Sequence, residues 1–377
     1  KHWRTHKMSQ TKVEAPFVSN NFAHFKNLVI NGDFRVFQRA SGSTAIGNGT
    51  YSTADRFKTQ FSNDGAGTTQ QYTMSDADRA TTGHSFAWQW DVGTADTSLA
   101  AGQLAYFRHF IEAQNCSGLA YGSSAAKTLT LSFWVKSAKT GTYCCTIQKD
   151  DSTKYQLPLE YTISSADTWE HKTLVVSPTA GSTSLITGSA GDIAQDNGKG
   201  ITLYWWLAAG SDYTGGTNNT WSDNANHLAT TNQVNWLDST DNDWFITGIQ
   251  FEIGDQATDF EHLPFDVQEQ RCQRYCMVYG NGQNFSGGYY NASSYVCEIY
   301  FPTKMRAAPS VTCTDISNSI RVYTNGGIDY LDTLGDNGDT VYQSQLYNNS
   351  DASATSGHRG GANINAGDFK LTYDSEL

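Results

Sequence analysis

One stretch, residues 244–279, constrains the fold more than any other, because its pattern changes from strand-like to helix-like. Four apolar residues of its first third share one face of an alternating pattern: Phe245, Ile249, Phe251 and Ile253. Alternation of this kind predicts a strand with one buried face. After Pro264 the apolar residues recur at helical spacing, and proline suits the first turn of a helix. We therefore expect a closing strand, then a short linking helix, with a β domain on each side.

The rest of the chain predicts an all-β protein. Charged residues make up only 16% of the 377 residues and aromatic residues 13%, and glycine is abundant, a composition that favours short strands joined by tight turns. The clearest alternation places four residues on one face: Leu129, Leu131, Phe133 and Val135. Many such segments predict a β-sandwich or jelly roll. The expected divisions are an extended N-terminal arm (1–26), a jelly roll (27–262), a linking helix (263–279) and a smaller C-terminal β domain (280–377).

Charge and hydropathy exclude several classes of partner. The net charge of −12 argues against binding to nucleic acid, which needs clustered Lys and Arg, and against adsorption to an anionic membrane. No apolar run approaches 18 residues, so we expect no membrane insertion. No signal peptide is visible, and the seven irregularly spaced cysteines indicate reduced thiols made in a cytoplasm. Cys272 and Cys276 could begin a zinc site, but their spacing is wrong for the common fingers, and buried thiols are favoured.

No catalytic motif stands in the sequence, so we expect no enzyme and no cofactor. His109 lies among apolar neighbours and is interpreted as a core histidine. One group of loop oxygens could hold structural calcium, which prefers oxygen ligands. Its members are Asp223, Asn224, Asp238, Asp241, Asn242 and Asp243. Ordinary use of these residues in turns and caps is the favoured interpretation.

Aromatic residues outside the expected core faces are the best candidates for binding. Trp134 lies on the polar face of its strand, Tyr204 and Trp206 do the same on another, and Tyr213, Trp221 and Trp236 fall in or beside a long polar insertion, residues 211–240. Exposed Trp and Tyr suit stacking on sugar rings and also suit protein interfaces. Burial under a second layer is the alternative for each residue. Because the insertion is long and aperiodic, we expect it to carry recognition, and Trp221→Ala to cost little stability.

Five segments, taken in order, resemble structural proteins of marine tailed bacteriophages. They are N-L-V-I-N-G-D-F-R-V-F-Q-R (27–39), A-D-R-F (54–57), T-L-T-L-S-F-W-V-K-S-A-K-T-G-T-Y (128–143), S-A-D-T-W (165–169), and the G-I-Q-F-E-I-G, A-T-D-F-E-H and C-Q-R-Y pieces within 248–275. The resemblance covers roughly residues 27–279. Asp259 stands where the family usually has proline in A-T-P-F-E.

The resemblance implies a tail fibre or other virion appendage with a jelly roll similar to carbohydrate-binding modules. The expected function is a receptor-binding subunit that recognises host surface glycan, located in the virion and released by lysis. The alternatives are a purely structural head fibre, decoration or collar protein, and a glycan depolymerase. The arm is expected to dock on other virion proteins. A homotrimer is also expected, held by tyrosines of the C-terminal domain: Tyr289, Tyr290, Tyr295, Tyr300, Tyr323, Tyr330, Tyr342 and Tyr347.

Overall fold

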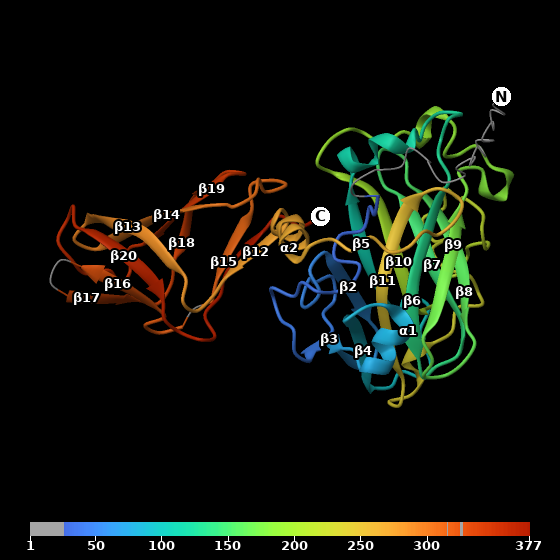
Figure 1. Ribbon diagram of the computed structural model, residues 1–377, viewed down its shortest axis with the longest axis horizontal. Helices are drawn as coiled ribbons and strands as arrows, with labels where there is room; N and C mark the ends of the chain where they lie inside the picture. Colours follow the sequence, from blue (N-terminus) through green and yellow to red (C-terminus); the bar gives the residue numbers. More distant parts are fainter. Residues whose placement is uncertain (1–25, 315, 325–326) are drawn as a thin grey trace, which may run out of the picture.

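The computed structural model describes residues 26–314, 316–324 and 327–377, and within them the chain is mostly antiparallel β-sheet. This confirms the all-β prediction. Two bodies lie end to end, with the helix α2 (Phe265–Gln273) between them (Figure 1). The predicted arm lies outside the described residues except for Lys26.

The first body is a sandwich of two sheets. The six-stranded sheet has the order β1 (Thr44–Ala45), β3 (Ala66–Thr73), β4 (Phe86–Thr94), β11 (Asp243–Ile253), β6 (Leu129–Ser137) and β9 (Glu170–Val176). The five-stranded sheet has the order β2 (Phe57–Ser62), β5 (Leu104–Glu112), β10 (Lys199–Ala209), β7 (Gly141–Lys149) and β8 (Tyr155–Ile163). A short helix, α1 (Asp76–Thr82), connects β3 to β4. Four 3-10 turns complete it: Ala113–Leu119, Ala180–Ser182, Ser189–Gly191 and Trp236–Asp238.

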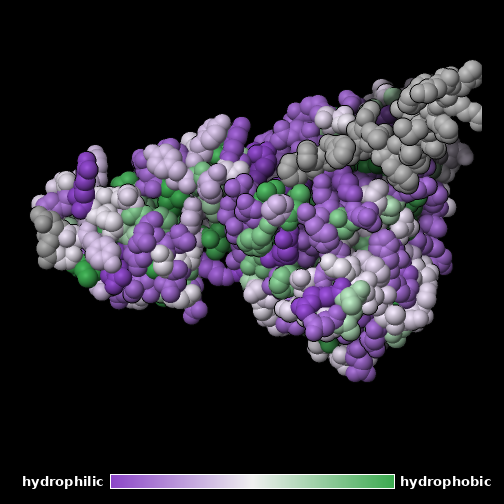
Figure 2. All heavy atoms as spheres, viewed as in Figure 1, coloured by the Kyte–Doolittle hydropathy of each residue, from purple (hydrophilic) through white to green (hydrophobic). Residues whose placement is uncertain are grey.

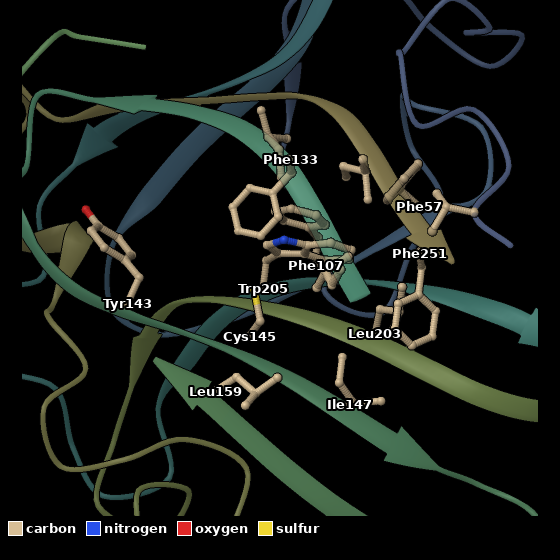
Figure 3. Packing of buried hydrophobic residues seen from close by; sticks show 14 of the residues in the cluster. Phe57, Phe107, Phe133, Tyr143, Cys145, Ile147, Leu159, Leu203, Trp205 and Phe251 are labelled. Atoms are coloured by element: carbon tan, nitrogen blue, oxygen red, sulfur yellow. The ribbon is translucent and has the colours of Figure 1, made fainter. Parts of the chain in front are cut away.

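An aromatic core fills the space between the two sheets (Figure 3). At its centre the rings of Phe107 and Trp205 stack with centroids 5.0 Å apart. Phe133 meets Trp205 edge-on at 6.2 Å. The alternating residues of β6 all point into this core, as the sequence predicted. His109 is also fully buried, and its Nε2 accepts a hydrogen bond from the Ile30 amide.

β11 forms as predicted, but its phase changes along its length. The pairing with β6 slips between Thr247 and Gln250, because a bulge inserts Gly248 at φ 62°. After the bulge, Ile249 and Phe251 keep the predicted face and lie in the core, whereas Ile253 at the strand end is 48% exposed, so its predicted burial is wrong. Before it, Phe245 turns outward and packs with another cluster, so its predicted placement is wrong.

The strand-like run at 27–39 is an irregular segment instead of a strand. Asn31, at φ 64°, bridges it: its amide nitrogen donates to the Val36 carbonyl at 2.8 Å, and its side-chain oxygen accepts from the Val36 amide at 3.0 Å. Of the alternating apolar side chains that suggest a strand here, Phe34 is buried in the main core, Ile30 and Val36 are buried in a smaller cluster, and Leu28 is partly buried.

The second body contains ten strands in two sheets. The smaller sheet has the order β12 (Cys276–Tyr279), β21 (Leu371–Asp374) and β15 (Ser310–Cys313). The seven-stranded sheet has the order β17 (Gly327–Leu331), β16 (Ile320–Thr324), β20 (Arg359–Ile364), β13 (Asn284–Asn291), β14 (Ser294–Tyr300), β19 (Gln343–Asn348) and β18 (Gly335–Asp339). The predicted linking helix therefore ends earlier than expected, because residues 276–279 are a strand of this sheet.

This second body has a core of its own, with Leu346, Phe369 and Leu371 fully buried. Tyr289 and Tyr295 belong to that core, so they are not the surface tyrosines that the sequence suggested. Five others are exposed: Tyr290, Tyr300, Tyr323, Tyr330 and Tyr342.

Buried charges join the two bodies. Glu112, at the end of β5, accepts hydrogen bonds from the Arg274 guanidinium at 2.6 and 3.1 Å and from the Tyr275 hydroxyl at 2.7 Å. Glu376, near the chain end, pairs with Arg56, which is fully buried in the jelly roll. The C-terminus accordingly lies at the junction, beside α2 (Figure 1).

The face shown in Figure 2 is mainly hydrophilic, with hydrophobic residues in small groups on both bodies. Among the helices of the described residues, none has the length and hydrophobicity that crossing a membrane requires.

Candidate functional site

Four of the six aromatic residues singled out from the sequence are buried. Tyr204 is 5% exposed, Trp221 2%, and Trp206 and Trp236 are fully buried, so their predicted exposure is wrong. The physical reason is the insertion at 211–240. It folds back onto the jelly roll and covers aromatic residues that would otherwise face water.

Trp221 and Trp236 belong to the main core, and each indole nitrogen donates to a backbone carbonyl. Trp221 Nε1 lies 2.8 Å from the Ser177 oxygen, and Trp236 Nε1 lies 3.1 Å from the Asp243 oxygen. Tryptophans held in this way position the loop, and their flat faces are not available to a ligand.

Tyr204 and Trp206 lie on the outer face of β10, as the alternation predicted, but a small cluster covers them. The indole nitrogen of Trp206 donates to the Thr146 hydroxyl at 3.0 Å, and its ring lies 5.8 Å from that of Tyr213. Tyr213 is half-buried and packs against Trp206, so its ring offers little free surface for a ligand to stack on.

Trp134 is the predicted residue that remains beside an open space. Its half-buried ring lines a hollow of about 490 Å³ on the outer face of the six-stranded sheet. The lining comprises Thr82, His84, Ser132, Trp134, His171, Gly248, Ala257, Thr258, Asp259, Phe260 and His262. The size lies within the usual range for small-molecule sites.

The sheet places one wall of this hollow. Trp134 on β6 and His171 on β9 are direct cross-strand partners, with ring centroids 5.0 Å apart. The bulge at Gly248 makes room for His84: a Cβ at this position would lie 2.4 Å from His84 Nε2. The bulge that shifts β11 therefore also admits an imidazole to the floor of the hollow.

The opposite wall is the segment 257–262, which is held against β11. Thr258 donates from its hydroxyl to Glu252 at 2.6 Å, and the Glu261 amide donates to the Gln250 side-chain oxygen at 2.8 Å. Fixed in this way, Phe260 meets His84 edge-on at 4.7 Å. His262 lies 4.9 Å from Phe260.

Two histidines of the hollow, His84 and His171, are uncharged at neutral pH. Burial, followed by smaller effects of the neighbouring His262, His171 and Arg35, lowers the pKa of His84 to about 3. Burial also lowers the pKa of His171. Neutral imidazoles can both donate and accept hydrogen bonds, and they sit here beside the Ser132 and Asp259 side chains. The hollow therefore combines aromatic faces with neutral polar groups and one carboxylate.

Sequence reasoning missed His84, His171, Phe260 and His262. The histidines come from three distant parts of the chain, and no spacing rule connects them. The available signal was the A-T-D-F-E-H segment of the resemblance, which lines the hollow.

The proposed calcium oxygens have other partners. Asp238 pairs with Lys139 and accepts from the Asn242 amide at 2.8 Å, and Asp243 accepts from the Ala138 backbone amide at 3.2 Å. Within the described ranges, no group of three or more His, Cys, Asp or Glu side chains is placed to hold a metal ion. Cys272 and Cys276 lie on α2 and β12, and both are buried thiols.

A second, larger hollow of about 780 Å³ lies on the seven-stranded sheet. Tyr290 (80% exposed) and Tyr300 (67% exposed) are among its lining residues, and Gly287 and Gly288 contribute backbone to it. It is the more open of the two and holds no buried polar cluster of the kind seen around His84.

The fold and this site define a two-domain all-β protein with an aromatic-lined hollow on its jelly roll. No protein-family profile and no curated protein sequence matches the chain. A putative sugar-binding protein from Bacteroides thetaiotaomicron is similar in structure, with 13% identity over 60% of this chain and 100% of that chain, and a TM-score of 0.32.

Two further solved structures show similarity. The enzymatically active domain of tailspike protein 4 from bacteriophage CBA120 has 13% identity over 61% of this chain and 22% of that chain, with a TM-score of 0.28. A family 11 carbohydrate-binding module of a Clostridium thermocellum cellulase has 10% identity over 58% of this chain and 99% of that chain, with a TM-score of 0.26. At these identities and scores, the similarities do not extend to function.

Proposed function

We propose that the jelly roll binds carbohydrate in the hollow beside Trp134. The observation that carries the proposal is the half-exposed Trp134 ring, set against neutral imidazoles and the hydroxyl of Ser132. Sugar rings have an apolar face that stacks on an indole and hydroxyls that need both donors and acceptors. The hollow offers these features together, whereas the other predicted tryptophans, Trp206, Trp221 and Trp236, are sealed in the core.

The charge of the hollow favours a neutral sugar. His84 and His171 have lowered pKa values and are uncharged near pH 7, which leaves Asp259 as the carboxylate among the lining residues. A carboxylate accepts hydrogen bonds from sugar hydroxyls but repels an acidic ligand. Hydrolysis of glycosides usually uses two carboxylates. We therefore propose binding without cleavage over the depolymerase alternative.

In its biological setting we propose a tailed-bacteriophage appendage, a tail-fibre or receptor-binding subunit that contacts host surface glycan in the virion. The sequence resemblance over residues 27–279 supports this assignment. The arm (1–26) would attach to other virion proteins, and the exposed tyrosines of the C-terminal body would join three subunits. A head fibre, decoration or collar protein is the alternative, favoured by those same exposed tyrosines.

A glycan array of neutral and acidic oligosaccharides, followed by calorimetry with the strongest neutral binder, tests the binding proposal. We expect Trp134→Ala to weaken binding at least tenfold and Trp134→Phe to weaken it less, because phenylalanine keeps a flat face. Tyr290→Ala, an exposed aromatic in the other hollow, is the matched control and should bind like the parent protein.

The reverse result, in which Tyr290→Ala abolishes binding and Trp134→Ala does not, would move the site to the C-terminal body. An array without any binding would contradict the receptor-binding function and leave the structural alternative. Deletion of residues 1–26 should abolish incorporation into particles, whereas unchanged incorporation would contradict the attachment role of the arm.

A further inference from the structure

The outer face of the five-stranded sheet carries a hollow of about 310 Å³ that the proposed function does not use. It lies on the opposite side of the sandwich from Trp134. β5 contributes Arg108 and Phe110, β10 contributes Lys199 and Tyr204, and the turn after β7 contributes Lys154. Lys58 on β2 is the direct cross-strand partner of Arg108. Four cationic side chains thus gather on one face of a chain whose net charge is −12.

These four cations lack direct ion-pair partners among the described residues, although Asp150 lies near Lys199 and Lys154. Among the described residues, no carboxylate forms an ion pair with Lys58, Arg108, Lys154 or Lys199. Repulsion is evident in their titration: burial lowers the pKa of Lys199, and Arg108, Lys58 and Lys154 lower it further against the opposing effect of Asp150. The pKa of Lys58 is lowered by burial and by Arg108. Like charges that lie close together without ion-pair partners raise the free energy of the folded protein, and a bound anion would lower it.

The acidic residues at this site are already engaged. Asp150 accepts from the Gln148 amide at 2.5 Å and from the Thr202 hydroxyl, so both of its oxygens have neutral donors. Burial raises the pKa of Asp150, against the opposing effects of these hydrogen bonds and of Lys199 and Lys154. Asp151 also lines the hollow, and it accepts a hydrogen bond from the Ala194 backbone amide.

Aromatic rings support the cations and shape the hollow. The Lys199 Nζ lies 4.2 Å from the centroid of the Phe110 ring, and the Arg108 guanidinium lies 5.0 Å from the same centroid. Arg108 Nε is buried and has no hydrogen-bond partner. A guanidinium held among rings with an unused donor is preorganised for a planar anion such as a carboxylate.

We propose that this hollow binds the acidic unit of a charged polysaccharide, a sugar that bears a carboxylate, with Arg108 and Lys199 as the anion-binding side chains. The size of the hollow is at the lower end of the range for small-molecule sites, which suits a single sugar unit. Asp150, Gln148 and Ser152 line it beside the cations and can bond hydroxyls. A densely charged phosphate chain fits less well, because Asp150 and Asp151 would face it.

The test uses three probes in calorimetry with the full-length protein: hexagalacturonate, its methyl ester, which removes the charge and keeps the sugars, and sodium acetate, a carboxylate without a sugar. We expect hexagalacturonate to bind at least tenfold more tightly than its ester, and to weaken severalfold between 50 and 300 mM NaCl because salt screens the attraction. Acetate alone should bind at least tenfold more weakly than hexagalacturonate.

Lys154→Gln with Lys199→Gln should weaken hexagalacturonate binding at least tenfold, and both positions are exposed, so the variant will fold. Arg108→Lys keeps the charge but not the planar fork and should weaken binding severalfold. Lys127→Gln with Lys304→Gln removes the same charge from exposed positions elsewhere and is the matched control.

Three outcomes would overturn the inference. In the first, the two double variants weaken binding equally. In the second, acetate matches hexagalacturonate, which would mark a small-anion site only. In the third, the ester binds as well as the acid and Trp134→Ala removes both; that result would uphold the neutral-glycan proposal for the other hollow while refuting this one.

Discussion

Trp221 provides the sharpest test of how the long insertion behaves. Its side chain is 2% exposed and packs in the main core, and its indole nitrogen donates to the Ser177 carbonyl at 2.8 Å. Truncating a buried tryptophan to alanine costs about 3–5 kcal/mol. The loss also leaves the Ser177 carbonyl without its donor, so we expect Trp221→Ala to lie at the upper end of that range.

The matched variant is Trp134→Ala, which removes the same atoms from a half-buried position. We expect it to cost about 1 kcal/mol, the centre of the distribution for single substitutions. Trp221→Phe keeps most of the volume and should fall between the two. Urea unfolding followed by circular dichroism measures all three. With a slope of about 3 kcal/mol per M, Trp221→Ala should lower the midpoint by more than about 1 M.

The two tryptophans should also separate in binding. Trp221→Ala, measured well below its unfolding midpoint, should retain glycan binding, whereas Trp134→Ala should lose it while remaining folded. If Trp221→Ala cost no more stability than Trp134→Ala, the assignment of the insertion to the core would be refuted. The original expectation of a recognition loop would then stand.

Three further predictions follow from buried charges and exposed rings. The folded pKa of His84 is about 3 and the unfolded value is about 6.5, so the unfolded state binds more protons between these values and the free energy of unfolding falls as the pH is lowered. In urea titrations, His84→Gln should remove about 2 kcal/mol of the stability loss between pH 7 and pH 5, and an unchanged loss would contradict the buried neutral histidine. Glu112→Gln should lower the free energy of unfolding by about 2–3 kcal/mol in a denaturation experiment. Lys139→Gln, which breaks the partly exposed pair with Asp238, should lower it by less than about 1 kcal/mol, and equal losses would contradict the buried junction. Tyr300→Asp with Tyr323→Asp should convert a trimer to monomers in sedimentation velocity, and a monomeric parent protein would contradict the trimer itself.

The trimer is tested with surface variants because the junction rules out a simple truncation. Removing the chain after Gly280 would delete Glu376, the ion-pair partner of Arg56. Arg56 is fully buried in the jelly roll, and a buried cation without its partner is costly. We therefore expect a chain truncated after Gly280 to have a destabilised jelly roll.

The strands could be predicted from the sequence because successive residues of a strand point to opposite faces, so a buried face appears as apolar residues at alternate positions. β6 is the clearest case, with each predicted core residue fully buried. The bulge in β11 could not be placed in the same way. One extra residue at Gly248 exchanges the faces before it, and a lone glycine in a strand indicates a bulge without fixing its register.

The Trp134 hollow was predictable only in part. Alternation along β6 placed Trp134 on the outer face, and the structure agrees. His84, His171 and His262 meet there because β4, β6, β9 and β11 are neighbours in one sheet, and strand order cannot be derived from spacing along the chain. The position of Trp134 therefore follows from the local sequence pattern, whereas the meeting of the three histidines follows only from the strand order of the sheet.

The buried tryptophans have a different explanation, which lies in the amide side chains of the insertion. Polar, aperiodic sequence was taken as solvated loop, yet a segment without strand pairing can still be buried if side chains replace the missing backbone partners. Gln233 does so by accepting from the Cys144 amide at 2.7 Å and donating to the Trp206 carbonyl at 3.2 Å. Asn242 donates to the Trp236 carbonyl at 2.7 Å. Asn and Gln next to tryptophans in such a loop are therefore as consistent with a covered core as with a binding surface. The neighbours of Trp134 are strand residues, so no such loop covers it.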